Sequence, residues 1–115
     1  MIVEERIYTL KFGKVGEYFK LYEEEGLAVQ RPILGNLLGY YSTETGTLNT
    51  VVHMWGYEDI TDRARRRAQL QADPRWKAYV PKLAATVERQ ENRILVPAPF
   101  FEATLRAMSA AAAVK

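Results

Sequence analysis

Four stretches of the chain have the composition and the alternation of β-strands. Each is short, and the first, residues 2–10, is rich in β-branched and aromatic residues. In the third stretch, Val52 and Met54 alternate with His53, Trp55 and Tyr57, which predicts a strand with two different faces. The predicted strands are residues 2–10, 37–44, 50–57 and 87–96.

Between these strands, apolar residues recur at helical spacing. The first predicted helix begins near Val15 and is closed by Pro32 and Gly35. A second, polar helix is predicted from residue 59 or 61 to residue 71. Its predicted inner stripe consists of Ile60, Ala64 and Ala68.

A third helix is predicted to begin at Asp73-Pro74, because aspartate caps helix N-termini and proline fits the first helical position. Proline lacks the amide hydrogen that a helix interior uses, so a kink or an early end is expected at Pro81. The residues from Phe100 onward are aromatic and then alanine-rich. They predict a short helix that packs on the domain or on a partner.

The predicted order is strand, helix, strand, strand, helix, a further short helix, strand, which is the split βαβ order of the ferredoxin-like fold. We therefore expect an α+β domain with an antiparallel sheet over residues 1–97, and a separate C-terminal tail over residues 98–115. Helices cover one face of such a sheet. The rings of His53, Trp55 and Tyr57 are predicted on the uncovered face. Because a large exposed apolar face usually marks an interface or a ligand groove, two sheets are expected to pack face to face as a dimeric α/β barrel.

Composition narrows the possible chemistry. The chain has 115 residues, a net charge of +2 and no cysteine, which excludes disulfides, thiolate metal sites and cysteine nucleophiles. No metal-ligand spacing, glycine-rich phosphate loop or serine elbow is present, so no cofactor and no metal are expected. The small net charge does not call for nucleic acid or a membrane as partner. Without an apolar N-terminal run or a spanning stretch, a cytoplasmic protein is expected.

Six dispersed motifs together resemble the NIPSNAP family over roughly residues 3–97. The motifs are Tyr8-Thr9-Leu10-Lys11-x-Gly13-Lys14-Val15, Tyr22-Glu23-x-x-Gly26-Leu27, Leu38-Gly39-Tyr40-Tyr41-x-Thr43-Glu44-x-Gly46-x-Leu48-Asn49, His53-Met54-Trp55-x-Tyr57, Ala72-Asp73-Pro74-x-Trp76 and Glu91-Asn92-Arg93-Ile94-Leu95. The resemblance implies a fold similar to that of dimeric α/β-barrel proteins, among them cofactor-free monooxygenases, and hence a homodimer. It implies no reaction, because the family has no agreed biochemical activity. Eukaryotic members are linked to mitochondria and to protein–protein interactions. No transit peptide is expected in this chain, which therefore looks more like a bacterial member.

His53, the only histidine, is the candidate catalytic residue, because histidine titrates near neutral pH. Alternatively, it is a buried histidine whose hydrogen bonds are satisfied. Trp55 shares its predicted face. Arg6 and Tyr8 on the first strand are candidate ligand-binding residues, as are Glu91 and Arg93 on the last. An equally good reading of these charged residues is a paired network that fixes strand register or the dimer.

The hairpin and its flanks supply the remaining candidates. Tyr41 is a candidate ligand-binding residue, and Glu44 and Asn49 are candidates at the mouth of the barrel. Turn chemistry is the preferred explanation of the loop residues, with Gly46 supplying a positive φ and Asn49 bonding the backbone. The run Arg63-x-Arg65-Arg66-Arg67 is best explained as a solvated helix face paired with carboxylates. Trp76, Tyr79 and Leu83 are predicted to be core.

Two functions remain open. In the first, the barrel interior binds or converts a small aromatic or carbonyl compound, and whether the protein is an enzyme is undecided. In the second, the chain is a non-catalytic structural or protein-interaction module. A third reading, in which Tyr8, Trp55 and Tyr57 stack on RNA bases, is weaker, because the third strand lacks the RNP1 pattern.

Overall fold

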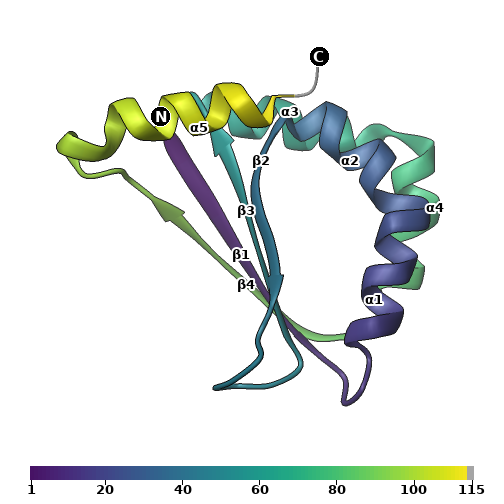
Figure 1. The fold of residues 1–115 in the computed structure, drawn as a ribbon. Coiled ribbons are helices and arrows are strands. Elements are labelled where there is room, and N and C mark those ends of the chain that lie inside the picture. Colours follow the sequence, from purple (N-terminus) through teal and green to yellow (C-terminus); the bar gives the residue numbers. More distant parts are fainter. Residues whose placement is uncertain (114–115) are drawn as a thin grey trace.

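A four-stranded antiparallel sheet organises the chain, and the computed structural model describes residues 1–113. The strands lie side by side in the order β2-β3-β1-β4, and every neighbouring pair is antiparallel. This confirms the predicted α+β fold with ferredoxin-like topology (Figure 1). The strands are β1 (Ile2–Leu10), β2 (Asn36–Ser42), β3 (Thr50–Tyr57) and β4 (Val87–Leu95).

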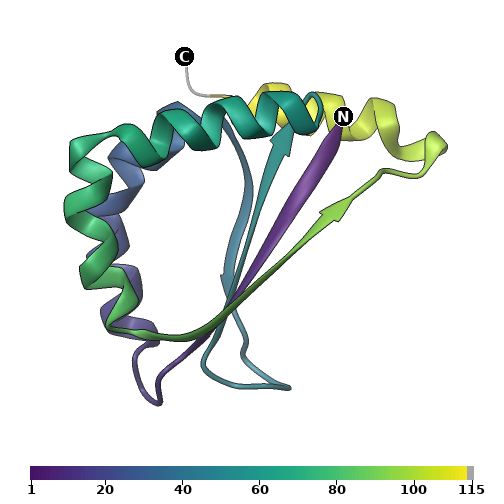
Figure 2. The same ribbon diagram turned by 180° about the vertical axis from the view of Figure 1, so that it is seen from behind.

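Two bent helical segments cover one face of this sheet, as Figures 1 and 2 show from opposite sides. The first predicted helix is continuous but contains a π-helical turn, where Gly26 lets the tyrosine rings close in. A Cβ atom at Gly26 would lie 2.7 Å from Tyr22 Cδ1 and 3.0 Å from the Tyr79 ring. The helices of this layer are α1 (Val15–Leu21), η1 (Tyr22–Gly26), α2 (Leu27–Leu34), α3 (Ile60–Ala72) and α4 (Pro74–Ala84).

The predicted start of the third helix is confirmed. Asp73 caps α4 by accepting a hydrogen bond from the backbone nitrogen of Arg75, and Pro74 occupies the first turn. The early end expected at Pro81 is wrong, since α4 continues to Ala84. One missing backbone hydrogen bond is tolerated there because Tyr79 and Leu83, on either side of Pro81, are anchored in the core.

The face assigned to the β3 rings is also wrong. His53, Trp55 and Tyr57 point toward the helices and are almost fully buried within a single chain. The strand carries apolar residues on both sides, including Val52 and Met54, so alternation alone does not tell which side the helices cover. Because these rings lie beneath helices, they form no open stacking platform for RNA bases.

The C-terminal tail forms the predicted short helix and packs on the opposite face of the sheet. It consists of the turn η2 (Pro99–Phe101) and the helix α5 (Glu102–Ala112), which crosses one end of the sheet (Figure 1). Gly56 on β3 permits this close packing, because a Cβ atom there would lie 2.7 Å from Ser109 Oγ. The N-terminal amine also binds Glu102, at 3.1 Å. Within the described residues, none of the helices combines the length and the apolar character needed to span a bilayer.

Candidate functional site

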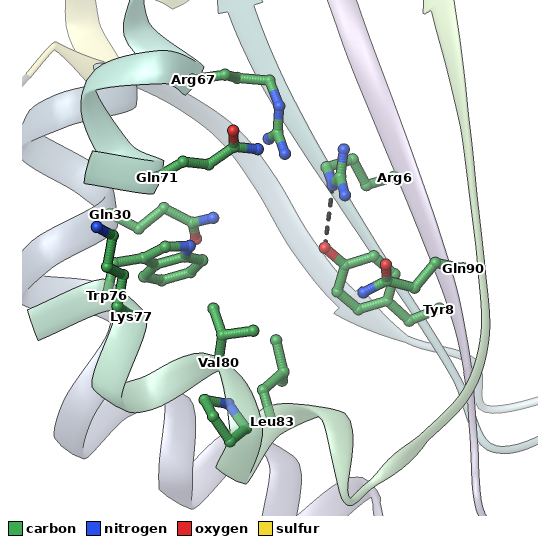
Figure 3. A pocket seen from close by; sticks show the side chains of 11 residues that line it. Arg6, Tyr8, Gln30, Arg67, Gln71, Trp76, Lys77, Val80, Leu83 and Gln90 are labelled. Atoms are coloured by element: carbon green, nitrogen blue, oxygen red, sulfur yellow. Dashed lines mark hydrogen bonds between the residues drawn. The ribbon is translucent and has the colours of Figure 1, made fainter. Parts of the chain in front are cut away.

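A pocket of about 410 Å³ opens between the sheet and the helices α3 and α4 (Figure 3). Its walls differ in chemistry. The α4 side contributes Trp76, Val80 and Leu83, which form an apolar wall. The opposite end is polar, with Arg6 from β1 and Arg67 from α3. The lining residues are Arg6, Tyr8, Gln30, Arg67, Gln71, Trp76, Lys77, Val80, Pro81, Leu83 and Gln90.

A buried carboxylate beside the pocket holds the polar end in place. Glu4 is fully buried, and its Oε2 accepts hydrogen bonds from Arg6 Nη1 at 3.0 Å, Arg63 Nη2 at 2.7 Å and Asn92 Nδ2 at 2.8 Å. Burial alone raises the pKa of Glu4. The hydrogen bonds from Arg63 and Asn92 and the charge of Arg6 outweigh it and hold the pKa at about 2. Glu4 is therefore ionised at neutral pH and ties β1, α3 and β4 together.

Arg6, held by Glu4, in turn fixes the hydroxyl group of Tyr8. Its Nε donates a hydrogen bond to the Tyr8 hydroxyl oxygen at 3.0 Å, and its guanidinium carbon lies 5.6 Å from the centre of the Tyr8 ring. Because the oxygen already accepts from Arg6, the Tyr8 O–H is left to donate. Tyr8 is thus held as a hydrogen-bond donor at the wall of the pocket.

His53 lies behind Tyr8 and outside the pocket lining. Its Nδ1 accepts a hydrogen bond from Trp55 Nε1 at 2.7 Å, and its ring stacks on Tyr40 with the centres 4.5 Å apart. The edge of the Tyr8 ring lies against it, at 4.9 Å between centres. Burial, followed by the charge of Arg6, lowers the pKa of His53 to about 3. The imidazole is therefore neutral, and its one lone pair is already engaged.

The other predicted site residues lie away from the pocket. Tyr41 is exposed on the opposite face of the sheet, and Glu44 is exposed in the hairpin loop. Asn49 has a positive φ of 57° and accepts a hydrogen bond from the Gly13 backbone nitrogen, as turn chemistry predicts. On β4, Arg93 pairs with Glu5 and Glu91 with Arg89, so both take part in exposed ion pairs. The structure thus brings Arg6 and Tyr8 to the pocket, with His53 and Trp55 directly behind them.

Sequence reasoning missed the arginines of α3. The solvated-face interpretation holds for Arg65 and Arg66, which pair with Asp62. It is wrong for Arg63, which reaches Glu4, and for Arg67, which lines the pocket. The predicted inner stripe is also wrong, since Ile60, Ala64 and Ala68 are exposed. The spacing of Arg63, Arg67 and buried Leu70 is the helical signal that would have found the inner face.

Other residues of the pocket carried no sequence signal of their own. Gln30, Gln71 and Gln90 come from α2, α3 and β4, and no motif marks them. Trp76, predicted to be core, is partly buried and also forms the apolar wall of the pocket. The pocket joins residues far apart in the chain, so its membership follows only from the fold.

Comparison with known proteins identifies the family. The NIPSNAP family model matches residues 3–102. The chain is 33% identical to a Protein NipSnap homolog of Dictyostelium discoideum and 36% identical to human Protein NipSnap homolog 3A. Each match covers 82% of this chain and only 41% and 39% of those proteins. The chain thus spans about two-fifths of the length of these relatives.

Solved structures agree with this assignment. A NIPSNAP family protein from Agrobacterium tumefaciens is 56% identical with a TM-score of 0.84, covering 86% of this chain and 94% of that one. An uncharacterized NIPSNAP-like domain protein from Burkholderia xenovorans is 53% identical with a TM-score of 0.84, covering 86% of each chain. A putative antibiotic biosynthesis monooxygenase from Nitrosomonas europaea shares the fold alone, with 14% identity and a TM-score of 0.62 over 84% of this chain and 98% of that one. From its sequence and its fold alike, this chain belongs to the NIPSNAP family.

Proposed function

We propose that this chain binds a small organic molecule in the pocket between the sheet and helices α3 and α4. The observation that carries the proposal is the division of one pocket into an apolar wall and a polar end. Its volume of about 410 Å³ lies within the range of sites for small molecules, which are mostly apolar with a few placed polar groups. An aromatic or aliphatic body would pack on Trp76, Val80 and Leu83.

The polar end suits a carbonyl oxygen. The Tyr8 O–H is oriented as a donor by Arg6, and Arg6 is in turn fixed by Glu4. Groups that are held in place before the ligand arrives bind it with less loss of entropy. The predicted role of His53 as a base receives less support, since its Nδ1 already accepts from Trp55. In this proposal, His53 supports the Tyr8 ring from behind.

A bulkier side chain in the apolar wall tests the pocket. Replacing Val80 with tryptophan is expected to fill the pocket and to weaken ligand binding at least about ten-fold, which is a loss of about 1.4 kcal/mol. The probes are benzaldehyde, acetophenone, phenylacetate and phenylacetamide, titrated by isothermal calorimetry. At least one of these compounds is expected to bind the unmodified protein with a Kd below about 1 mM.

Ala78→Trp is the matched control, because Ala78 is exposed on the same helix and does not line the pocket. This variant is expected to bind as the unmodified protein does. Binding of none of the four probes would refute the proposed pocket, as would equal affinity of the Val80→Trp and Ala78→Trp variants.

A second candidate function, as an interaction module, is favoured by the other face of the sheet. There an apolar groove of about 380 Å³ lies between the sheet and α5. Its lining includes Val3, Leu38, Met54 and Met108, and Tyr41, Phe101 and Met108 remain exposed at its border. We propose that a second copy of this chain covers this face. In a two-fold dimer the same patch meets itself, so the exposed side chains of one copy are brought to the groove of the other.

Introducing a charge into this groove tests the homodimer. Met108→Lys is expected to convert a dimer into a monomer, because the dimer would bury the new ammonium group without a partner. Native mass spectrometry and light scattering measure the change, and circular dichroism verifies the fold. The control is Ala107→Lys, at the neighbouring exposed position of α5 that does not line the groove. A monomeric unmodified protein, or a dimeric Met108→Lys variant, would contradict the proposal.

A further inference from the structure

We propose that the ligand of this pocket is an organic monocarboxylate, with its carboxylate group bound between Arg67 and Arg6. This inference rests on the proposed function and names the class of compound. It follows from the charges at the polar end of the pocket and from the direction in which the hydrogen-bonding groups there point.

The pocket lining is unbalanced in charge. It includes three cationic side chains, from Arg6, Arg67 and Lys77, and none of its residues is an acid. The carboxylate of Glu4, which pairs with Arg6 beside the pocket, already accepts from Arg6, Arg63 and Asn92 through its Oε2. Counting Arg6, Arg63 and Arg67 against Glu4 leaves two positive charges uncompensated, an excess that an anion would relieve.

At the polar end of the pocket, Arg6 pairs with Glu4, whereas Arg67 has no partner among the described residues. Within residues 1–113, its guanidinium makes no hydrogen bond or ion pair, although Arg63, Arg65 and Arg66 on the same helix all pair with carboxylates. Burial and the nearby charge of Arg6 lower the pKa of Arg67, which still remains charged at neutral pH. Figure 3 shows its side chain reaching from α3 into the pocket, on the side of Arg6. A guanidinium in this position matches the planar, two-oxygen geometry of a carboxylate.

Two neutral side chains of the pocket, Gln30 and Tyr8, are also left to donate. Gln30 is only 3% exposed, and its Oε1 accepts a hydrogen bond from the Tyr22 hydroxyl at 2.6 Å. Its amide nitrogen is therefore left to donate, and Figure 3 shows the end of this side chain facing the pocket. The Tyr8 O–H is likewise left to donate, because its oxygen accepts from Arg6. An anion in the pocket supplies an acceptor for both donors.

The apolar wall restricts the class of anion. Trp76, Val80 and Leu83 face the same space as the two arginines, so the ligand carries a hydrophobic body beside its charge. A free inorganic anion would leave this wall in contact with water and gain nothing from it. A small aromatic or aliphatic acid uses both halves of the pocket.

Calorimetry with matched pairs of probes tests the inference. Phenylacetate and phenylacetamide have the same shape and differ in charge, and so do hexanoate and hexanamide. Each acid is expected to bind at least about ten-fold more tightly than its amide. Arg67→Gln is expected to remove this preference by weakening the acids at least about ten-fold while leaving the amides unchanged, and Arg67→Lys is expected to retain part of it. The control is Arg65→Gln, an exposed position on the same helix, which should bind as the unmodified protein does.

The outcomes separate this inference from the proposed function. If amides bind as tightly as acids, or if Arg67→Gln leaves the preference intact while the protein is folded, the ligand is not a carboxylate and the pocket proposal stands. If inorganic phosphate binds as tightly as the acids, the class is wrong and the site is a simple anion site. If neither acid binds but benzaldehyde, acetophenone or an amide does, this inference fails and the pocket proposal stands. If none of these compounds binds, both proposals fail together.

Discussion

Replacing Glu4 with glutamine is expected to lower the free energy of unfolding by about 3–5 kcal/mol. The carboxylate is fully buried and accepts hydrogen bonds from Arg6, Arg63 and Asn92. Glutamine keeps the size of the side chain but removes the charge, which leaves two guanidinium groups in a partly buried position without their counterion. Urea denaturation followed by circular dichroism measures the loss. Because Arg6 also orients Tyr8, the same variant is expected to weaken ligand binding.

The neighbouring residue provides a matched control. Glu5 lies on the opposite face of β1 and pairs with the exposed Arg93 at 2.7 Å. Surface ion pairs of this kind contribute about 0–1 kcal/mol, so Glu5→Gln is expected to change stability by no more than that. Both variants replace a glutamate with glutamine, and they differ in the face of β1 that carries the residue. Equal losses for both would show that the buried cluster around Glu4 does not stabilise the fold.

The order of the elements could be predicted because it depends on local patterns. Strand alternation, helical spacing and the Asp73-Pro74 cap are all signals within a few residues, and each led to the correct element. It was harder to predict which face of each element is buried. In β3 both sides carry apolar residues, and the prediction placed His53 and Trp55 on the wrong one. Which side is covered depends on where the helices pack, and that is a property of the whole chain.

The pocket was predictable only in part, for a related reason. On α3, hydrophobicity favoured the alanines as the inner stripe, yet Arg63 and Arg67 point inward. The burial of Arg63 is stabilised by Glu4, which is distant in sequence and carries no hydrophobic signal of its own. Arg6 and Tyr8 were found because they share one face of a strand with clear alternation. The inner face of α3 thus depends on charge pairing between residues far apart in the sequence, which the local hydrophobic pattern does not show.

Lowering the pH from 6.5 to 4.5 is expected to reduce the free energy of unfolding by about 2–3 kcal/mol through His53 alone. The pKa of this histidine is lowered from 6.5 to about 3 in the folded protein, chiefly by burial and then by the charge of Arg6, with Arg67 adding to the effect and Glu4 opposing it. Below pH 6.5, His53 therefore binds a proton in the unfolded chain but stays neutral in the folded one. Its contribution to the free energy of unfolding is complete above this pH and falls by about 1.4 kcal/mol for each pH unit below it. Below pH 4.5, protonation of Glu4 in the unfolded chain steepens the fall, because its folded pKa is also lowered.

His53→Gln separates this effect from other acid-sensitive groups. The amide oxygen of glutamine can still accept the hydrogen bond from Trp55, but the side chain does not titrate. The variant is expected to lose the slope between pH 6.5 and 4.5 whatever its stability at neutral pH. Because the chain has one histidine, its ring protons are also easily followed by NMR. A chemical-shift titration centred near pH 6.5 in the folded protein would show that the ring accepts a proton freely, and the role of His53 as a base would then regain support.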